Sequence, residues 1–121
     1  MNTLFVFLRE KIKSANSLKR YQKQIKFIEK KITIFQAKAA NETLKKTKLK
    51  VDLIGFHGQT IFHNAAKKVT KQLGDGKLLS KLTKKNVVYG FRQKDLKNGG
   101  EGAPLTPIFH QMLQKKFNIK Q

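Results

Sequence analysis

The sequence contains no cysteine, so disulfide bonds and thiolate metal ligands are excluded, which fits a reducing compartment. It also has no apolar run that approaches the roughly 20 residues needed to cross a bilayer. The opening residues MNTLFVFLREKIK are apolar and then basic, which is the reverse of a secretory signal. We therefore expect a cytoplasmic protein without a membrane partner.

Acidic residues are scarce, because 7 Asp and Glu face 27 Lys and Arg, for a formal net charge of +20. Such an excess can attract nucleic acid or another polyanion. Arginine is scarce too, with only Arg9, Arg20 and Arg92, although arginine forks and exposed aromatic residues are what nucleic-acid recognition usually employs. The lysines are spread along the whole chain between apolar positions. A lysine-rich solvated surface is the favoured interpretation, and a polyanion- or nucleic-acid-binding module without catalysis stays open as the alternative.

One modest domain fits in 121 residues, and its clearest element is a long helix. Apolar residues recur at steps of three and four, which predicts an amphipathic helix over residues 18–46. Phe27 and Ile34 widen its apolar face beyond the seam of a two-stranded coiled coil, so we expect the helix to pack on a sheet. The predicted stripe consists of Leu18, Tyr21, Ile25, Ile28, Ile32, Phe35 and Ala39.

Strands and short helices follow. The patterns predict strands over residues 51–56, 60–63, 68–73 and 86–91. Asp75 is placed to cap a short helix whose inner face holds Leu78, Leu79 and Leu82. A glycine-rich loop over residues 97–107 precedes a last helix, opened by Thr106 and Pro107, with the apolar residues Ile108, Phe109, Met112, Leu113 and Phe117. The order predicts an α/β fold with a mixed sheet flanked by helices.

The tetrapeptide HGQT follows the first strand directly. In open α/β sheets, ligands lie beyond the carboxyl ends of strands. His57, Gln59 and Thr60 offer hydrogen-bond donors and acceptors, and Gly58 permits a close approach to the backbone, a set that suits a polyhydroxylated ligand. Alternatively, His57 and Gln59 satisfy buried backbone groups at the strand end.

Three motifs carry a family resemblance: DLIGFHGQTIFH, QLGDGKLL and FRQKDLKNGGEGAPLTPIFH. Their order and separation resemble those of the anhydro-N-acetylmuramic acid kinases, members of the superfamily of sugar kinases, actin and heat-shock ATPases. The likeness is most specific over residues 51–110, and the helix over 18–46 matches by pattern. The resemblance implies part of an actin-like, ribonuclease H-like ATPase domain.

The resemblance also implies an activity. Such enzymes phosphorylate 1,6-anhydro-N-acetylmuramic acid at the expense of ATP and open its anhydro ring with water, forming N-acetylmuramic acid 6-phosphate in peptidoglycan recycling and amino sugar metabolism. The full-length family would need ATP, Mg²⁺ and a general base.

Motifs for those groups are not found in this sequence. The family's phosphate-binding hairpin carries a GTSxDG pattern, and its general base lies in a DTGPGN-like segment. We therefore expect residues 1–121 to form a single partial domain of the amino-terminal lobe, without the phosphate-binding hairpin and the carboxy-terminal lobe, and to be inactive in isolation. No catalytic, cofactor-binding or metal-binding residue is assigned, because His63 and His110 lack a third ligand. The expected partners are the amino sugar and either the missing remainder of the kinase or a second copy.

Carried over by position, the resemblance assigns a sugar-side wall to His57, Gly58, Gln59 and Thr60. Arg92 suits a carboxylate such as the sugar's lactyl group, or else it pairs with Asp95. We expect this wall and the glycine-rich loop to converge around the sugar. The loop is shaped by Gly99, Gly100, Gly102 and Pro104.

Two positions depart from the family pattern. Gly90 stands where the family usually has Asp, which removes a carboxylate near Arg92. Glu101 stands where the family usually has Gln, which places a negative charge in the loop. Both departures bear on how the sugar is contacted.

Overall fold

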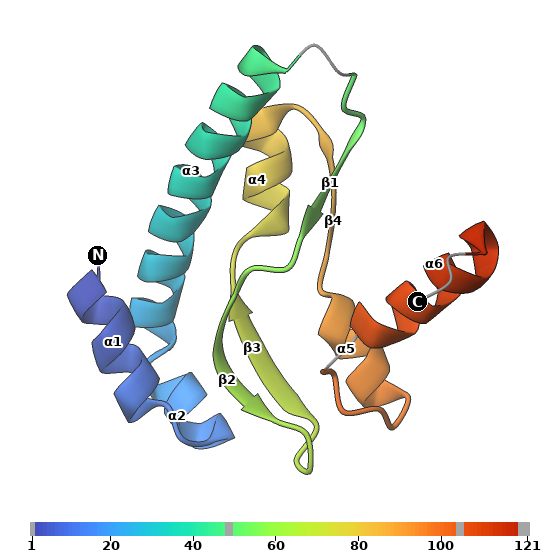
Figure 1. Cartoon of the computed structure of the whole chain (residues 1–121). Coiled ribbons are helices and arrows are strands. Elements are labelled where there is room, and N and C mark those ends of the chain that lie inside the picture. Colours follow the sequence, from blue (N-terminus) through green and yellow to red (C-terminus); the bar gives the residue numbers. More distant parts are fainter. Residues whose placement is uncertain (1, 48–49, 104–105, 119–121) are drawn as a thin grey trace.

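A computed structural model describes residues 2–47, 50–103 and 106–118 of the chain. Helices surround two small pairs of strands, and the long helix α3 runs along one side of the molecule (Figure 1). The elements are α1 (Asn2–Lys11), α2 (Ala15–Arg20), α3 (Gln22–Lys46), β1 (Leu53–Phe56), β2 (Gln59–Asn64), β3 (Val69–Leu73), α4 (Gly76–Thr83), β4 (Asn86–Tyr89), α5 (Phe91–Lys97) and α6 (Thr106–Phe117).

The predicted long helix is present, but it is interrupted at Tyr21 between α2 and α3. A capping box fixes the start of α2, in which the Ser14 hydroxyl accepts from the Ser17 backbone N–H and the Ser17 hydroxyl accepts from that of Ser14. Helix α1 was not predicted. It supplies Leu8, which is fully buried, and Ile12 follows directly after it.

The buried stripe of α3 differs from the predicted one in its second half. Ile25 and Ile28 are buried as expected, but the expectation for Phe35 and Ala39 was wrong: Phe35 is 63% exposed and Ala39 is exposed as well. Thr33 and Ala37 are buried in their place. The first half of α3 packs on one cluster and Ala37 packs on another with Phe56 and Leu79, so the buried face rotates along the helix.

The α/β class with parallel and antiparallel pairing and flanking helices is confirmed. In the described residues the strands form two separate pairs. β1 pairs in parallel with β4, and β2 pairs antiparallel with β3, with a register shift between Thr60 and Phe62. Because β2 continues the course of β1 after a turn at His57 and Gly58, the two pairs follow one another along the molecule (Figure 1).

Two hydrophobic clusters hold these elements. The larger joins α1, α3 and the β2–β3 pair through Leu8, Ile12, Ile25, Ile28, Ile61 and Leu73. The smaller joins α3, β1 and α4 through Ala37, Phe56 and Leu79. Asp75 caps α4 as predicted, its carboxylate accepting from the Leu78 N–H at 2.9 Å, but of the expected inner face only Leu79 is buried and Leu82 is exposed.

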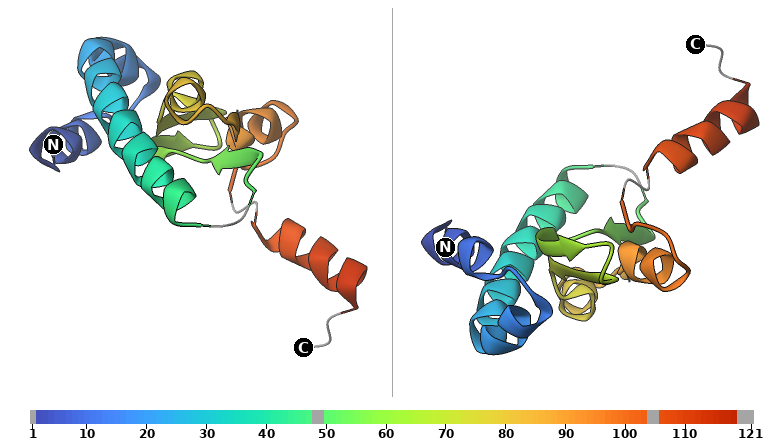
Figure 2. Two further views of the ribbon diagram at one scale, coloured as in Figure 1. Left: turned by 90° about the horizontal axis from the view of Figure 1, so that it is seen from above. Right: turned by 90° about the horizontal axis from the view of Figure 1, so that it is seen from below.

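The carboxy-terminal half brings further corrections. The predicted strand over 86–91 ends at Tyr89, because Gly90 adopts a left-handed conformation (φ 76°) and α5 begins at Phe91. Helix α6 confirms the predicted last helix and extends away from the other elements, with Met112 and Phe117 exposed (Figure 2). Pro104 and the side chains of Thr106, Ile108 and Phe109 lie outside the described residues. Over the described part of the chain, no helix combines the length and apolarity that a membrane span requires.

Candidate functional site

The HGQT segment lies at the carboxyl end of the parallel strands. Phe56, the last residue of β1, pairs with Tyr89, the last residue of β4. His57, which follows β1, and Gly90, which follows β4, therefore lie next to each other at the same end of the sheet. Arg92 lies in the first turn of α5, two residues beyond Gly90, and is partly buried. The structure thus brings Arg92 to the end of the sheet from which His57, Gly58, Gln59 and Thr60 emerge, the segment that we call the rim.

Gly58 is required by the fold at this point. Its φ is +68°, and a Cβ there would lie 2.5 Å from the Leu73 carbonyl oxygen. The close approach that this glycine permits is therefore to the backbone of β3, and Gly58 itself is buried. It shapes the rim by letting the β1–β2 turn pass directly over the end of β3.

The polar side chains of the rim differ in their partners. Thr60 is partly buried, and its hydroxyl lies 3.4 Å from the side-chain amide of Gln72, which donates a shorter bond of 2.7 Å to the Thr70 hydroxyl. His57 and Gln59 are exposed, and neither side chain hydrogen-bonds another group in the described residues. In the described residues neither side chain satisfies a buried backbone group, and their role in sugar binding stays a prediction.

Asp95 organises the glycine-rich loop. Its carboxylate accepts from the Gly102 N–H at 2.7 Å, and its carbonyl oxygen accepts from the Gly100 N–H at 2.9 Å. A side chain at Gly100 would collide with the Asp95 carboxylate, while Gly99 (φ +89°) and Gly102 (φ +71°) adopt left-handed conformations. All three glycines are therefore needed for the shape of the loop. Asp95 acts as the loop hydrogen-bonder, and no ion pair joins it to Arg92 among the described residues.

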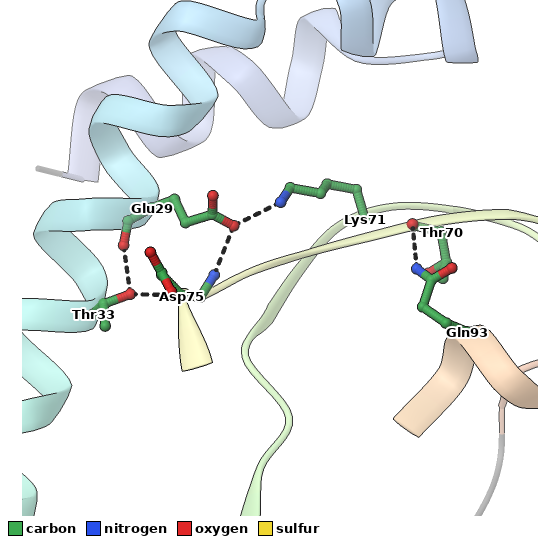
Figure 3. A network of polar contacts seen from close by, with 7 residues as sticks. Glu29, Thr33, Thr70, Lys71, Asp75 and Gln93 are labelled. Atoms are coloured by element: carbon green, nitrogen blue, oxygen red, sulfur yellow. Dashed lines mark hydrogen bonds and ion pairs between the residues drawn. The ribbon is translucent and has the colours of Figure 1, made fainter. Parts of the chain in front are cut away.

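The loop and Arg92 lie at opposite ends of α5. That helix has 7 residues, which at about 1.5 Å per residue separates its ends by roughly 10 Å. The Gln93 side-chain amide donates to the Thr70 carbonyl oxygen at 3.2 Å and so fastens α5 to β3 (Figure 3). The convergence of the loop and the rim around one ligand stays a prediction. Glu101 of the loop is exposed.

The acidic side chains of the described residues do not gather into a cluster of metal ligands. No group of three or more His, Asp or Glu side chains lies together in residues 2–47, 50–103 and 106–118. Asp75 and Asp95 already accept backbone N–H groups, and Asp52 lies 3.8 Å from Lys50 on the surface.

Sequence reasoning missed a polar network behind the rim. Glu29 and Thr33 of α3 bind the turn between β3 and α4 (Figure 3). A signal was present, because both residues lie between the buried positions Ile28 and Ala37 of an otherwise apolar face. Polar residues within a buried stripe usually have a specific hydrogen-bonding partner.

Comparison with known proteins decides the family. The family model described as anhydro-N-acetylmuramic acid kinase matches residues 6–121. The chain belongs to the anhydro-N-acetylmuramic acid kinase family. The resemblance noted in its motifs is thereby confirmed.

Curated members of this kinase family give the extent of the match. The anhydro-N-acetylmuramic acid kinase of Pelagibacter ubique is 54% identical over 114 residues, which are 94% of this chain and 30% of that kinase. The kinase of Rhodopseudomonas palustris is 43% identical over 74% of this chain and 25% of its own length, and that of Rhizobium etli is 40% identical over 78% and 26%. The chain thus spans about a quarter to a third of the relatives that it matches. Their common name favours the kinase interpretation over the polyanion-binding alternative.

Proposed function

We propose that this chain serves an ATP-dependent kinase that phosphorylates 1,6-anhydro-N-acetylmuramic acid and opens its anhydro ring to give N-acetylmuramic acid 6-phosphate. The observation that carries the proposal is the family match over residues 6–121, together with 54% identity to the Pelagibacter kinase. The activity belongs to peptidoglycan recycling in the cytoplasm, where ATP is available.

Within that enzyme, the chain contributes the sugar-side wall. The exposed His57 and Gln59 side chains have free donors and acceptors for sugar hydroxyl and acetamido groups. Arg92 presents a planar cation that can bind the lactyl carboxylate with two parallel hydrogen bonds. Gly58 holds the turn in place, and Thr60 adds a hydroxyl at its base. These groups bind and orient the sugar, while none of them is proposed to take part in the transfer itself.

The binding sites for ATP and Mg²⁺ and the general base are proposed to lie in the part of the kinase that this chain does not match. We propose that residues 1–121 form one partial domain of the amino-terminal lobe, and that the rest of the kinase supplies the phosphate-binding hairpin and the second lobe. The division is supported by Asp75 and Asp95, whose carboxylates accept backbone N–H groups of a helix cap and of the glycine-rich loop. The isolated chain is expected to bind sugar without turnover.

The outer face of the β1–β4 pair is the proposed contact with the rest of the kinase. Leu53, Val88 and Phe91 are 57%, 44% and 43% exposed there, and Gly55 leaves the backbone open beside them. Parallel strands are usually covered on both faces, whereas here α3 and α4 cover one. The occupant is the kinase polypeptide that makes up the larger share of each curated relative. A second copy is disfavoured because each chain carries a formal charge of +20.

A reconstitution assay tests the function. The chain alone, given ATP, Mg²⁺ and the anhydro sugar, should form no phosphosugar. Adding the part of the Pelagibacter kinase outside the 114 matched residues should restore turnover, with the intact Pelagibacter protein as the positive control. Turnover by the chain alone would contradict the proposed division of groups. A mixture that assembles but phosphorylates no anhydro sugar would contradict the proposed activity.

A further inference from the structure

We propose that Glu29 and Thr33 of α3 are positioning residues that hold the sugar-side rim in place. Neither residue belongs to the rim, and both act through the turn between β3 and α4. The inference rests on the proposed function in one respect only, namely that the rim binds sugar. The structural part of the inference can be tested without any ligand.

The first step is the set of hydrogen bonds by which α3 holds the turn between β3 and α4. One carboxylate oxygen of Glu29 accepts from the Lys71 ammonium at 2.6 Å and from the Gly74 N–H at 3.2 Å (Figure 3). One helical turn further on, the Thr33 hydroxyl accepts from the Asp75 N–H at 2.9 Å and donates to the Glu29 carbonyl oxygen at 2.7 Å. Two consecutive backbone N–H groups are thus bound by one helix, which fixes both the position and the rotation of the turn.

Burial of the two side chains strengthens these hydrogen bonds. The Thr33 residue is fully buried, and the Glu29 side chain is 18% exposed. Hydrogen bonds to a charged group in such surroundings are stronger than those between neutral groups at the surface. Removing either acceptor would leave a backbone N–H of the partly buried turn without its hydrogen-bond partner.

The second step links the turn to the rim. Gly74 (φ +145°) lies directly against Phe56, since a Cβ there would be 2.5 Å from the ring, and 3.4 Å from the Gly58 Cα. Gly58 in turn has no room for a side chain over the Leu73 carbonyl. Any movement of Leu73 and Gly74 must therefore displace Phe56 and Gly58, which flank His57. The network behind the turn sets the position of the rim.

The test uses amide resonances of the whole chain. In Glu29→Ala and Thr33→Val, the amides of residues 57–60 should shift. Hydrogen exchange should rise roughly tenfold at Gly74 in Glu29→Ala and at Asp75 in Thr33→Val, as expected for the loss of one hydrogen bond. Glu29→Gln keeps an acceptor for the Gly74 N–H and should restore the native values. Lys71→Met removes only the ammonium partner of Glu29 and should leave the rim unchanged.

A matched control distinguishes a general loss of stability from a specific displacement of the rim. Gln24→Gly, at an exposed position on the same helix, should weaken α3 by about 1 kcal/mol without touching the turn. If Gln24→Gly altered the rim amides as much as Glu29→Ala does, the effect would be general unfolding and the positioning role would be refuted. The role would also be refuted if Glu29→Ala and Thr33→Val changed Gly74 and Asp75 but left residues 57–60 as in the native chain.

Sugar binding supplies the functional measurement. The affinity for 1,6-anhydro-N-acetylmuramic acid should fall roughly tenfold in Glu29→Ala and recover in Glu29→Gln, in proportion to the displacement of the rim. Displaced rim amides in a chain whose native form binds no sugar would support the positioning role and contradict the proposed function. Native affinity in Glu29→Ala despite displaced amides would contradict the functional part of this inference.

Discussion

At the scale of single residues, the end of the parallel strands contains two glycines, Gly58 and Gly90, that are required for different reasons. Gly58 has both a left-handed backbone and a neighbouring carbonyl oxygen in the place of a side chain, whereas Gly90 has a left-handed backbone and open space around it. A side chain at Gly90 would therefore add only backbone strain, whereas one at Gly58 would add backbone strain and steric overlap. That contrast gives a direct measure of how tightly the rim is packed on β3.

Gly58→Ala should lower the free energy of unfolding by about 2–5 kcal/mol, because left-handed strain of about 1–2 kcal/mol adds to overpacking of about 1–3 kcal/mol. Gly90→Ala, the matched control, should lose only the strain of about 1–2 kcal/mol. Urea unfolding monitored by circular dichroism measures both. Equal losses in the two variants would mean that the contact between Gly58 and Leu73 does not constrain the chain.

Asp95 governs the glycine-rich loop from the end of α5. Asp95→Ala should increase hydrogen exchange at Gly102 at least roughly tenfold, because a buried N–H loses its charged acceptor. Asp95→Asn keeps an oxygen acceptor and should retain most of the protection. Unchanged exchange at Gly102 in Asp95→Ala would show that the loop holds its shape without this carboxylate.

At the scale of elements, α4 is fixed by its first residues. Asp75→Ala should lower the free energy of unfolding by about 1 kcal/mol, the usual effect of losing an N-cap side chain. Asp75→Asn preserves the cap and should be nearly neutral. Thermal unfolding of the three proteins measures the difference. A native-like Asp75→Ala would mean that packing of Leu79 alone holds the helix.

Sequence patterns predicted most of these elements, since helical periodicity, strand composition and cap residues are local properties. The long helix, the strands and the Asp75 cap followed from such signals. The rotation of the buried face of α3 did not, because it depends on which element packs on each half, and that is a tertiary property. Helix α5 was not predicted: its first residue, Phe91, was placed in a strand and its last residue, Lys97, in the loop, and the residues between them were assigned to no element.

The candidate site was predictable only where it depends on local sequence and on the order of the elements. The position of His57 and Gln59 at a strand end could be inferred from the order of elements, and Arg92 joins them through the pairing of β1 with β4. Glu29 lies 45 residues before Gly74, so their contact could not be inferred from local spacing. The spacing of Arg92 and Asp95 offered an ion pair as one alternative, yet the Asp95 carboxylate accepts the Gly102 N–H instead.

At the scale of the whole molecule, the open face of the β1–β4 pair leads to a prediction about assembly. The part of the Pelagibacter kinase outside the matched residues should form a one-to-one complex with this chain, and Val88→Lys should abolish it by placing a charge in an apolar contact. Ile34→Lys changes a similarly exposed apolar residue of α3 and should leave the complex intact. Light scattering after gel filtration measures the masses. A stable homodimer, or a complex insensitive to Val88→Lys, would contradict the assigned surface.

The central claim is that residues 57–60 and Arg92 form one sugar-binding wall at the end of the parallel strands. Its most direct test is a titration of the isotope-labelled chain with 1,6-anhydro-N-acetylmuramic acid, with glucose as the control sugar. Amide shifts should concentrate at residues 57–60 and 90–92, extend to the loop at residues 99–102 if that loop closes on the ligand, and weaken in Arg92→Gln but not in Arg9→Gln. Shifts confined to other surfaces, or equal responses to glucose, would contradict the account.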